Sequence, residues 1–498
     1  MKRYYTLFGL TIVVCFVVEL LSYLSFHIGW LNPVIGGLIV ITTLILSLKN
    51  LKYGLGIIMI EAIIGSQGYL FSLSGSGGGF SLRIALWIAV MAVWLLTIIS
   101  EYRRDRQILY RYATFRYARP LALIAAGVIL GFSVALLAGN DLTYLFLDGK
   151  RWIFALIILP FLDTFTKKEE LKELATVSFA AALWLSIKTL IIVFIFSHSF
   201  PHLTADIFGW LRADLLAEVT RLPNGFWRVF MQSQNFVIPL FFVSALSLVM
   251  PWQWLRENKG SSIALVGIAT AASATLMACL SRSFWIGTVV AVVVWILVQL
   301  IFIRKNWNVF FKQISVFAVT VFLGLILLVV IVRFPFPEPS TAIDASLLSD
   351  RATQNEAGSA SRWSLLPVLW KEVSASPLWG KGFGTTVTYV TSDPRITLST
   401  TDGKYTTYAF EWGWLDLWLK TGLIGVLGYL WLFYMLLSDC YRLMRRGDSR
   451  ALAVGLSLSA LGVLHFFTPY LNHPLGFSYL ILAMLAVTFL RTQAITRS

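Results

Sequence analysis

Charged residues are scarce in this sequence: Asp, Glu, Lys and Arg make up 13% of the 498 residues, whereas 58% are hydrophobic. Soluble globular domains carry about twice that share of charge, so this class is excluded. The apolar residues fall in runs of about 20, the length of a transmembrane helix. These runs lack the two-residue alternation of membrane barrel strands. The sequence therefore predicts an all-α, polytopic transmembrane helical bundle, with residues 1–498 as a single transmembrane domain.

Cysteines and paired carboxylates are also few. Cys15, Cys279 and Cys440 lie far apart, in or beside apolar runs. This spacing excludes a disulfide framework and a cysteine metal site. No Asp-x-Asp pair occurs, so a metal-chelating carboxylate site has no support. We expect neither a metal nor another cofactor.

The apolar runs predict about 14 spans, and basic residues follow every even-numbered run. This bias favours cytoplasmic N- and C-termini, and it explains the net charge of +15 without a nucleic-acid partner. Lys2 and Arg3 precede the first run without a small-residue cleavage site, so we expect an uncleaved first helix. The runs are 4–25, 31–48, 53–72, 81–100, 118–138, 151–165, 174–198, 228–250, 261–279, 283–303, 314–334, 412–436, 451–469 and 474–490.

Two polar segments lie on the extracytoplasmic side in this topology. Residues 199–227 include apolar residues at helical spacing, which predicts an amphipathic helix on the membrane surface. Residues 335–410 contain no apolar run of spanning length and are expected to form one large loop, with a short helix within 362–375. A connection this long in a compact protein is usually functional.

Four charged residues near the extracytoplasmic boundaries are candidates for chemistry: Arg228, Arg282, Arg362 and Glu411. Each arginine alone has a simpler interpretation as a snorkelling residue, and Glu411 as a carboxylate at a helix start. Together they suit a phosphate-bearing lipid, because a guanidinium gives paired hydrogen bonds to phosphate oxygens. A nearby carboxylate can accept a proton from a sugar hydroxyl.

Two further sets of charges lie inside apolar runs. Lys188 is in the middle of a span, and Asp163 is a possible partner. Such a pair is either functional or a structural pair facing the bundle interior. Asp416 and Lys420 are four residues apart on one predicted helix, which favours a structural ion pair.

Three motifs in residues 225–430 resemble the O-antigen ligase and O-antigen polymerase superfamily. The first is SRS at 281–283, at the entrance to a span. The second is Arg362 followed by Trp370 and SPLWGKGFGT at 376–385. The third is EWGWLDLWLKTGLIG at 411–425, in which Glu411 stands where the family has a histidine.

The resemblance implies an inverting, metal-independent glycosyltransferase with a glycan donor on undecaprenyl pyrophosphate and a glycan or lipid-linked glycan acceptor. It assigns Arg228, Arg282 and Arg362 to the pyrophosphate, and it assigns proton transfer to Glu411, with Arg282 also in the catalytic group. Because the family histidine is absent, three extracytoplasmic histidines are possible substitutes: His198, His202 and His473.

We interpret the chain as a polymerase or ligase of surface polysaccharide in the bacterial inner membrane, with the active site on the extracytoplasmic face. The polymerase is favoured because Glu411 departs from the ligase pattern. Two other classes stay open: a flippase or transporter of lipid-linked oligosaccharide, and a non-catalytic membrane assembly partner. A transporter is typically built from paired repeats with polar residues along its path. Neither feature is evident in the sequence apart from Lys188.

Overall fold

The computed structural model describes residues 2–73, 80–104, 108–198, 200–222, 225–249, 258–303, 307–339, 357–391 and 403–495. Within these ranges, eleven helices are long and apolar enough to cross a membrane by length and composition. Only two small sheets of two strands each accompany the helices of this described part. The prediction of an all-α, polytopic membrane protein is confirmed.

The eleven helices of spanning length coincide with eleven of the predicted runs. They are α1 (Lys2–His27), α2 (Leu31–Lys49), α4 (Leu82–Arg104), α6 (Ala118–Ala138), α9 (Lys168–Ser197), α13 (Lys259–Ala278), α14 (Arg282–Val298, extended by the π-turn Gln299–Ile303), α15 (Trp307–Val332), α19 (Gly413–Arg445), α20 (Ser449–Phe467) and α21 (Pro474–Ile495).

The other three predicted runs contain shorter helices. These are α3 (Leu51–Ile64), α8 (Ile158–Thr164) after the 3-10 turn Phe154–Ile157, and α11 (Val237–Ser247). The run that starts at residue 228 opens as a strand instead of a helix, followed by the 3-10 turn Gln232–Phe236. Aromatic and β-branched residues such as Trp227 and Val229 favour the strand.

The remaining elements are short helices, one longer helix and two hairpins. They are α5 (Ile108–Thr114), α7 (Leu142–Ile153), α10 (Pro201–Ala213), α17 (Ala357–Ala375), β1 (Glu218–Arg221) paired with β2 (Trp227–Phe230), β3 (Val387–Val390) paired with β4 (Lys404–Thr407), and the 3-10 turn Tyr470–Asn472.

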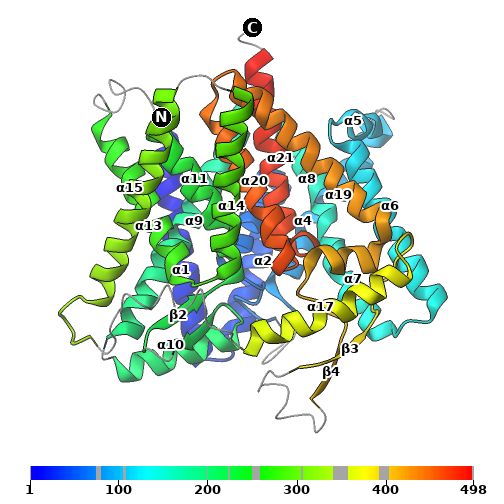
Figure 1. The fold of residues 1–498 in the computed structure, drawn as a ribbon, viewed down its shortest axis with the longest axis horizontal. Helices are drawn as coiled ribbons and strands as arrows, with labels where there is room; N and C mark the ends of the chain where they lie inside the picture. The colour runs from blue at the N-terminus through cyan, green and yellow to red at the C-terminus, as the bar shows by residue number, and fades with distance from the viewer. Residues whose placement is uncertain are drawn as a thin grey trace.

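The two ends of the bundle differ in what they carry (Figure 1). Both termini lie at one end together with α5, and we call this the termini end. Helices α10 and α17 and the two hairpins lie at the opposite end, which we call the hairpin end. Which end faces the cytoplasm stays a prediction from the basic loops.

Two predicted segments differ from the structure. Residues 199–227 are not one amphipathic helix, because α10 stops at Ala213 and the chain turns into the β1–β2 hairpin. Helix α17 is longer than the predicted 362–375 and contains Pro367. The 335–410 loop is described only in part, since 340–356 and 392–402 lie outside the described residues, as does the Gly/Ser turn at 74–79.

Lys188 is buried and its ammonium lies 2.5 Å from the Glu19 carboxylate, with the Ile64 carbonyl at 3.2 Å. The prediction that Asp163 is the possible partner of Lys188 is wrong. Its carboxylate instead accepts hydrogen bonds from Trp94 and Tyr112. A charge buried in a membrane bundle needs an opposite charge nearby, and the structure supplies it from α1.

Helix α19 holds the hairpin end to the bundle through its packing on α6. A methyl group added to Gly127 would lie 2.6 Å from the Cα of Gly425, so only glycine permits this close crossing. Gly422 interrupts α19 with φ 65°, a conformation that favours glycine. The loop before α19 packs at this interruption, where the Leu423 amide donates to the Leu378 carbonyl at 3.1 Å.

Candidate functional site

The guanidinium of Arg362 donates a hydrogen bond to the Glu411 carboxylate, joining two of the four predicted site residues. Arg362 is on α17, and Glu411 lies two residues before α19 begins. The two side chains are 41% and 53% exposed, so both remain open to a substrate. The indole of Trp412 fixes the backbone of this pair by donating to the Arg362 carbonyl at 2.8 Å.

Arg228 lies on β2 and reaches the turn that precedes Arg282. Its Nε donates to the Cys279 carbonyl at 3.0 Å, and its guanidinium stacks 4.9 Å from the Phe230 ring centroid. Arg282 is the first residue of α14, directly after Ser281. The α13–α14 turn therefore fixes both arginines in one region.

The three predicted arginines form a cluster, which we call the arginine cluster: Arg228, Arg282 and Arg362. Burial lowers the pKa of Arg228 below its ordinary value. The positive charges of Arg362 and Arg282 lower this pKa further, while Cys279 and Glu218 act in the opposite direction. Arg282 and Arg362 also interact electrostatically with each other. Positive charges gathered from β2, α14 and α17 create a field that attracts an anion.

Glu218 is a second carboxylate beside the cluster that the sequence did not single out. In the hairpin register Glu218 pairs with Phe230 and Thr220 pairs with Arg228. Glu218 and Arg228 therefore share one face of the hairpin as diagonal neighbours, a separation of about 7–8 Å between Cα atoms. Sequence reasoning placed Glu218 on an amphipathic helix. Its β-branched neighbours Val219 and Thr220 were the signal for a strand.

The SPLWGKGFGT segment at 376–385 connects α17 to the bundle. The Asn140 side-chain amide donates to the carbonyls of Lys381 at 3.1 Å and Phe383 at 2.9 Å. Gly382 has φ 80°, and a methyl group there would lie 2.5 Å from the Ala135 amide nitrogen. These contacts tie the segment to the C-terminal end of α6, so they position α17 and Arg362.

A buried network of charged residues contacts the segment at 376–385. Lys420 lies 2.6 Å from Asp416, which confirms the predicted pair, and 2.8 Å from Asp148 on α7. Asp148 also accepts a hydrogen bond from the Gly384 amide at 3.2 Å. The carboxylate of Asp416 further accepts from Asn472. Sequence analysis missed Asp148, because nothing in the spacing brings α7 to α19.

The three histidines have separate surroundings. His198 is buried, and its ring nitrogens contact the carbonyls of Phe194 at 2.7 Å and Phe334 at 2.9 Å, as expected for a structural residue. His202 is exposed on α10. Burial lowers the pKa of His473 well below its ordinary value, and the charges of Arg151 and Arg83 add to this effect. None of the contacts described for these histidines joins them to Arg362 or Glu411.

The described residues contain no group of three or more His, Cys, Asp or Glu side chains arranged to hold a metal ion. The charged groups described at this site are three guanidinium groups and the carboxylates of Glu411 and Glu218. Guanidinium groups at a partly buried position bind phosphate oxygens in pairs.

Comparison with known proteins finds one family. Residues 266–430 match the model of the O-antigen ligase family. This stretch includes Arg282, Arg362 and Glu411 and stops short of Arg228. No curated protein matches the chain. The family implies a multi-pass membrane enzyme that transfers glycans and uses lipid-linked glycan substrates. The match confirms, over residues 266–430, the predicted resemblance to the O-antigen ligase and O-antigen polymerase superfamily.

Proposed function

We propose that this chain is an extracytoplasmic, inverting and metal-independent glycosyltransferase of the bacterial inner membrane. It transfers a glycan from undecaprenyl pyrophosphate to a sugar hydroxyl, and polymerisation is favoured over ligation to a different acceptor. The observation that carries the proposal is the gathering of Arg228, Arg282 and Arg362 beside Glu411.

The arginines bind the pyrophosphate of the donor. Arg228 is held by the Cys279 carbonyl and the Phe230 ring, so its guanidinium is oriented before substrate arrives. Arg362 is more exposed, and a surface ion pair contributes about 0–1 kcal/mol to stability. Pyrophosphate can therefore take Arg362 from Glu411 at little cost.

Release from Arg362 frees Glu411 to act as the general base. The acceptor hydroxyl attacks the anomeric carbon from the side opposite the pyrophosphate, and its proton passes to Glu411. The new carbon–oxygen bond joins donor glycan to acceptor, while the bond to pyrophosphate breaks. Undecaprenyl pyrophosphate leaves with both electrons of that bond, its charge stabilised by the arginine cluster.

The direct test uses purified protein and lipid-linked donor in detergent, with polymer or conjugate as the readout. Arg282→Ala should abolish product, and Arg282→Lys should recover little, because an ammonium cannot reproduce a planar two-point contact. Arg212→Gln is a matched control, since Arg212 is an exposed arginine of α10 at the same end, over the Phe208 ring. Full activity of Arg282→Ala would refute the assignment of Arg282.

A further inference from the structure

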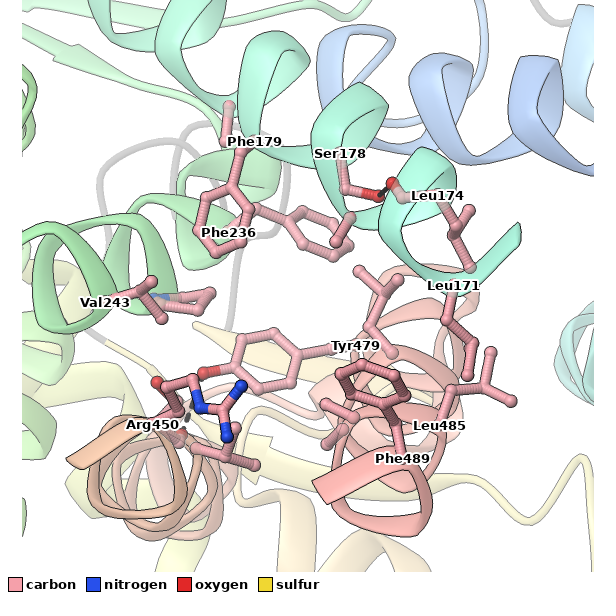
Figure 2. A pocket seen from close by; sticks show the side chains of 18 of the residues that line it. Leu171, Leu174, Ser178, Phe179, Phe236, Val243, Arg450, Tyr479, Leu485 and Phe489 are labelled. Carbon is pink, nitrogen blue, oxygen red and sulfur yellow. Dashed lines mark hydrogen bonds between the residues drawn. The ribbon is translucent and has the colours of Figure 1, made fainter. Parts of the chain in front are cut away.

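An apolar cavity of about 270 Å³ lies between α9, α11, α20 and α21. Figure 2 shows Phe179 and Phe236 on one side of this cavity and Arg450 and Phe489 on the other. Arg450 is 45% exposed, so the cavity reaches the protein surface at the end of the bundle where α20 begins. We call this space the first tail cavity.

A second cavity of about 410 Å³ adjoins the first. Leu171, Leu485 and Phe489 line both, so their side chains form the wall between them. Phe115, Leu162 and Phe165 supply the other large apolar side chains. We call this space the second tail cavity.

A third, polar pocket of about 380 Å³ adjoins both tail cavities. It is lined by the turn between α19 and α20, including Arg446, Ser449 and Arg450. Arg450 also lines the first tail cavity, and Gln493 also lines the second. The polar pocket thus lies next to each of the two largely apolar cavities, with one lining residue in common in each case.

We propose that these three spaces form a binding site for one diacyl phospholipid with an anionic head group. The phosphate head group binds at Arg446 and Arg450, and one acyl chain enters each tail cavity. A single-chain lipid phosphate would leave one cavity empty. The site is distinct from the arginine cluster, because α17 and β2 lie at the opposite end of the bundle (Figure 1).

The charges at the pocket fit a phosphate. Asp448 pairs with Arg450 at 2.7 Å and so offsets the charge of that arginine. Arg446 adds a second, exposed cation to the pocket. Lys172 lines the first tail cavity and Lys168 the second. The cations therefore outnumber the single carboxylate of the polar pocket. Basic pockets between transmembrane helices on the cytoplasmic side are a recurrent mode of binding anionic lipids.

The test measures lipid retained by the purified, detergent-solubilised protein, using native mass spectrometry with added phosphatidylglycerol, phosphatidylethanolamine or undecaprenyl phosphate. The wild-type protein should retain one phosphatidylglycerol in preference to either other lipid. The double variant Arg446→Gln/Arg450→Gln should weaken this binding at least about tenfold, because it removes the charge-assisted hydrogen bonds to the phosphate. Arg442→Gln is the matched control, because Arg442 is 67% exposed near the same turn and does not line the pocket.

A second variant tests the apolar part of the site. Ala486 is half-buried on α21 and lines the first tail cavity, so Ala486→Phe should fill space that an acyl chain needs. This variant should lose phosphatidylglycerol while keeping a wild-type elution profile by size exclusion. Retention of phosphatidylglycerol at the wild-type level by Ala486→Phe or by the arginine double variant would overturn the proposal. So would a preference for undecaprenyl phosphate, or an equal loss of binding in Arg442→Gln.

Discussion

Arg362 and Glu411, 49 positions apart in the sequence, form an ion pair across the boundary between α17 and α19. Both remain about half exposed, and the charges of Arg228 and Arg282 act on the same region. A cationic group and a carboxylate are thus held together at a position that is open to solvent. A surface ion pair of this kind contributes little to the free energy of unfolding, which is compatible with the proposed exchange of partners.

Exchanging the two residues separates the structural role of this pair from its proposed chemical role. Arg362→Glu/Glu411→Arg keeps an ion pair between the same positions, so thermal stability should stay within about 1 kcal/mol of wild type. Product formation should nevertheless be lost, because the guanidinium and the carboxylate have changed places. Product formation at the wild-type level in the exchanged variant would mean that the pair is only structural.

The buried network beneath the site should be far more sensitive to substitution. Lys420→Met leaves Asp148 and Asp416 buried without their cation, and breaking a buried pair in this way costs about 3–5 kcal/mol. Lys381→Gln is the control, since Lys381 pairs with Glu372 at a position where both side chains are about one-third exposed. Thermal unfolding in detergent should show a large loss for Lys420→Met and little change for Lys381→Gln. A loss of similar size in both would contradict this ranking.

Asp214 should make stability depend on pH. Burial raises its pKa to about 6, while hydrogen bonds from Ser22 and Trp210 oppose the shift. The folded state thus binds this proton more tightly than the unfolded state. The contribution of Asp214 to the free energy of unfolding is therefore most favourable at low pH and is lost as pH rises from about 4 to 6. Asp214→Asn keeps an acceptor for Ser22 and removes the charge. It should therefore stabilise the protein at pH 8 more than at pH 4, by no more than about 3 kcal/mol.

Thermal unfolding of both proteins at the two pH values measures this difference. A stability gain that is equal at pH 4 and pH 8 would assign it to packing rather than to the titration of Asp214.

The orientation in the membrane can be tested by labelling single cysteines. Thr406 is exposed on β4 at the hairpin end, and Ser449 begins α20 at the other end. The three native cysteines are buried in the structure and can be replaced. A membrane-impermeant maleimide added to intact cells should label Thr406→Cys and not Ser449→Cys. The opposite result would place the arginine cluster on the cytoplasmic side.

Sequence reasoning predicted the membrane class, and it selected four charged residues that the structure places near one another, for physical reasons that can be named. Apolar run length is set by bilayer thickness, so the spanning helices were visible in the sequence. Guanidinium chemistry pointed to Arg228, Arg282 and Arg362. The strand at Arg228 was missed because the mean hydropathy of residues 228–250 favours a span, and hydropathy does not distinguish a strand from a helix there.

The sequence did not predict the ion pairs between residues that lie far apart in the chain. Glu19 with Lys188, and Asp148 with Lys420, join helices whose contact depends on tertiary packing. Asp163 was the nearer carboxylate in the sequence, but Trp94 and Tyr112 bind it instead. Glu218 became a candidate only when the hairpin register placed it on the same face as Arg228.

The most direct test of the central claim is the turnover of Glu411→Gln with purified lipid-linked donor, measured as polymer or conjugate formed at matched protein levels. Glutamine keeps the shape of the side chain and can still accept a hydrogen bond from Arg362, but it cannot take a proton. Removing a general base typically lowers the rate about 10²- to 10⁴-fold. We expect a loss of that order with donor binding retained, and partial activity in Glu411→His. Turnover near wild type in Glu411→Gln would contradict the account, and Glu218→Gln would then be the next variant to assay.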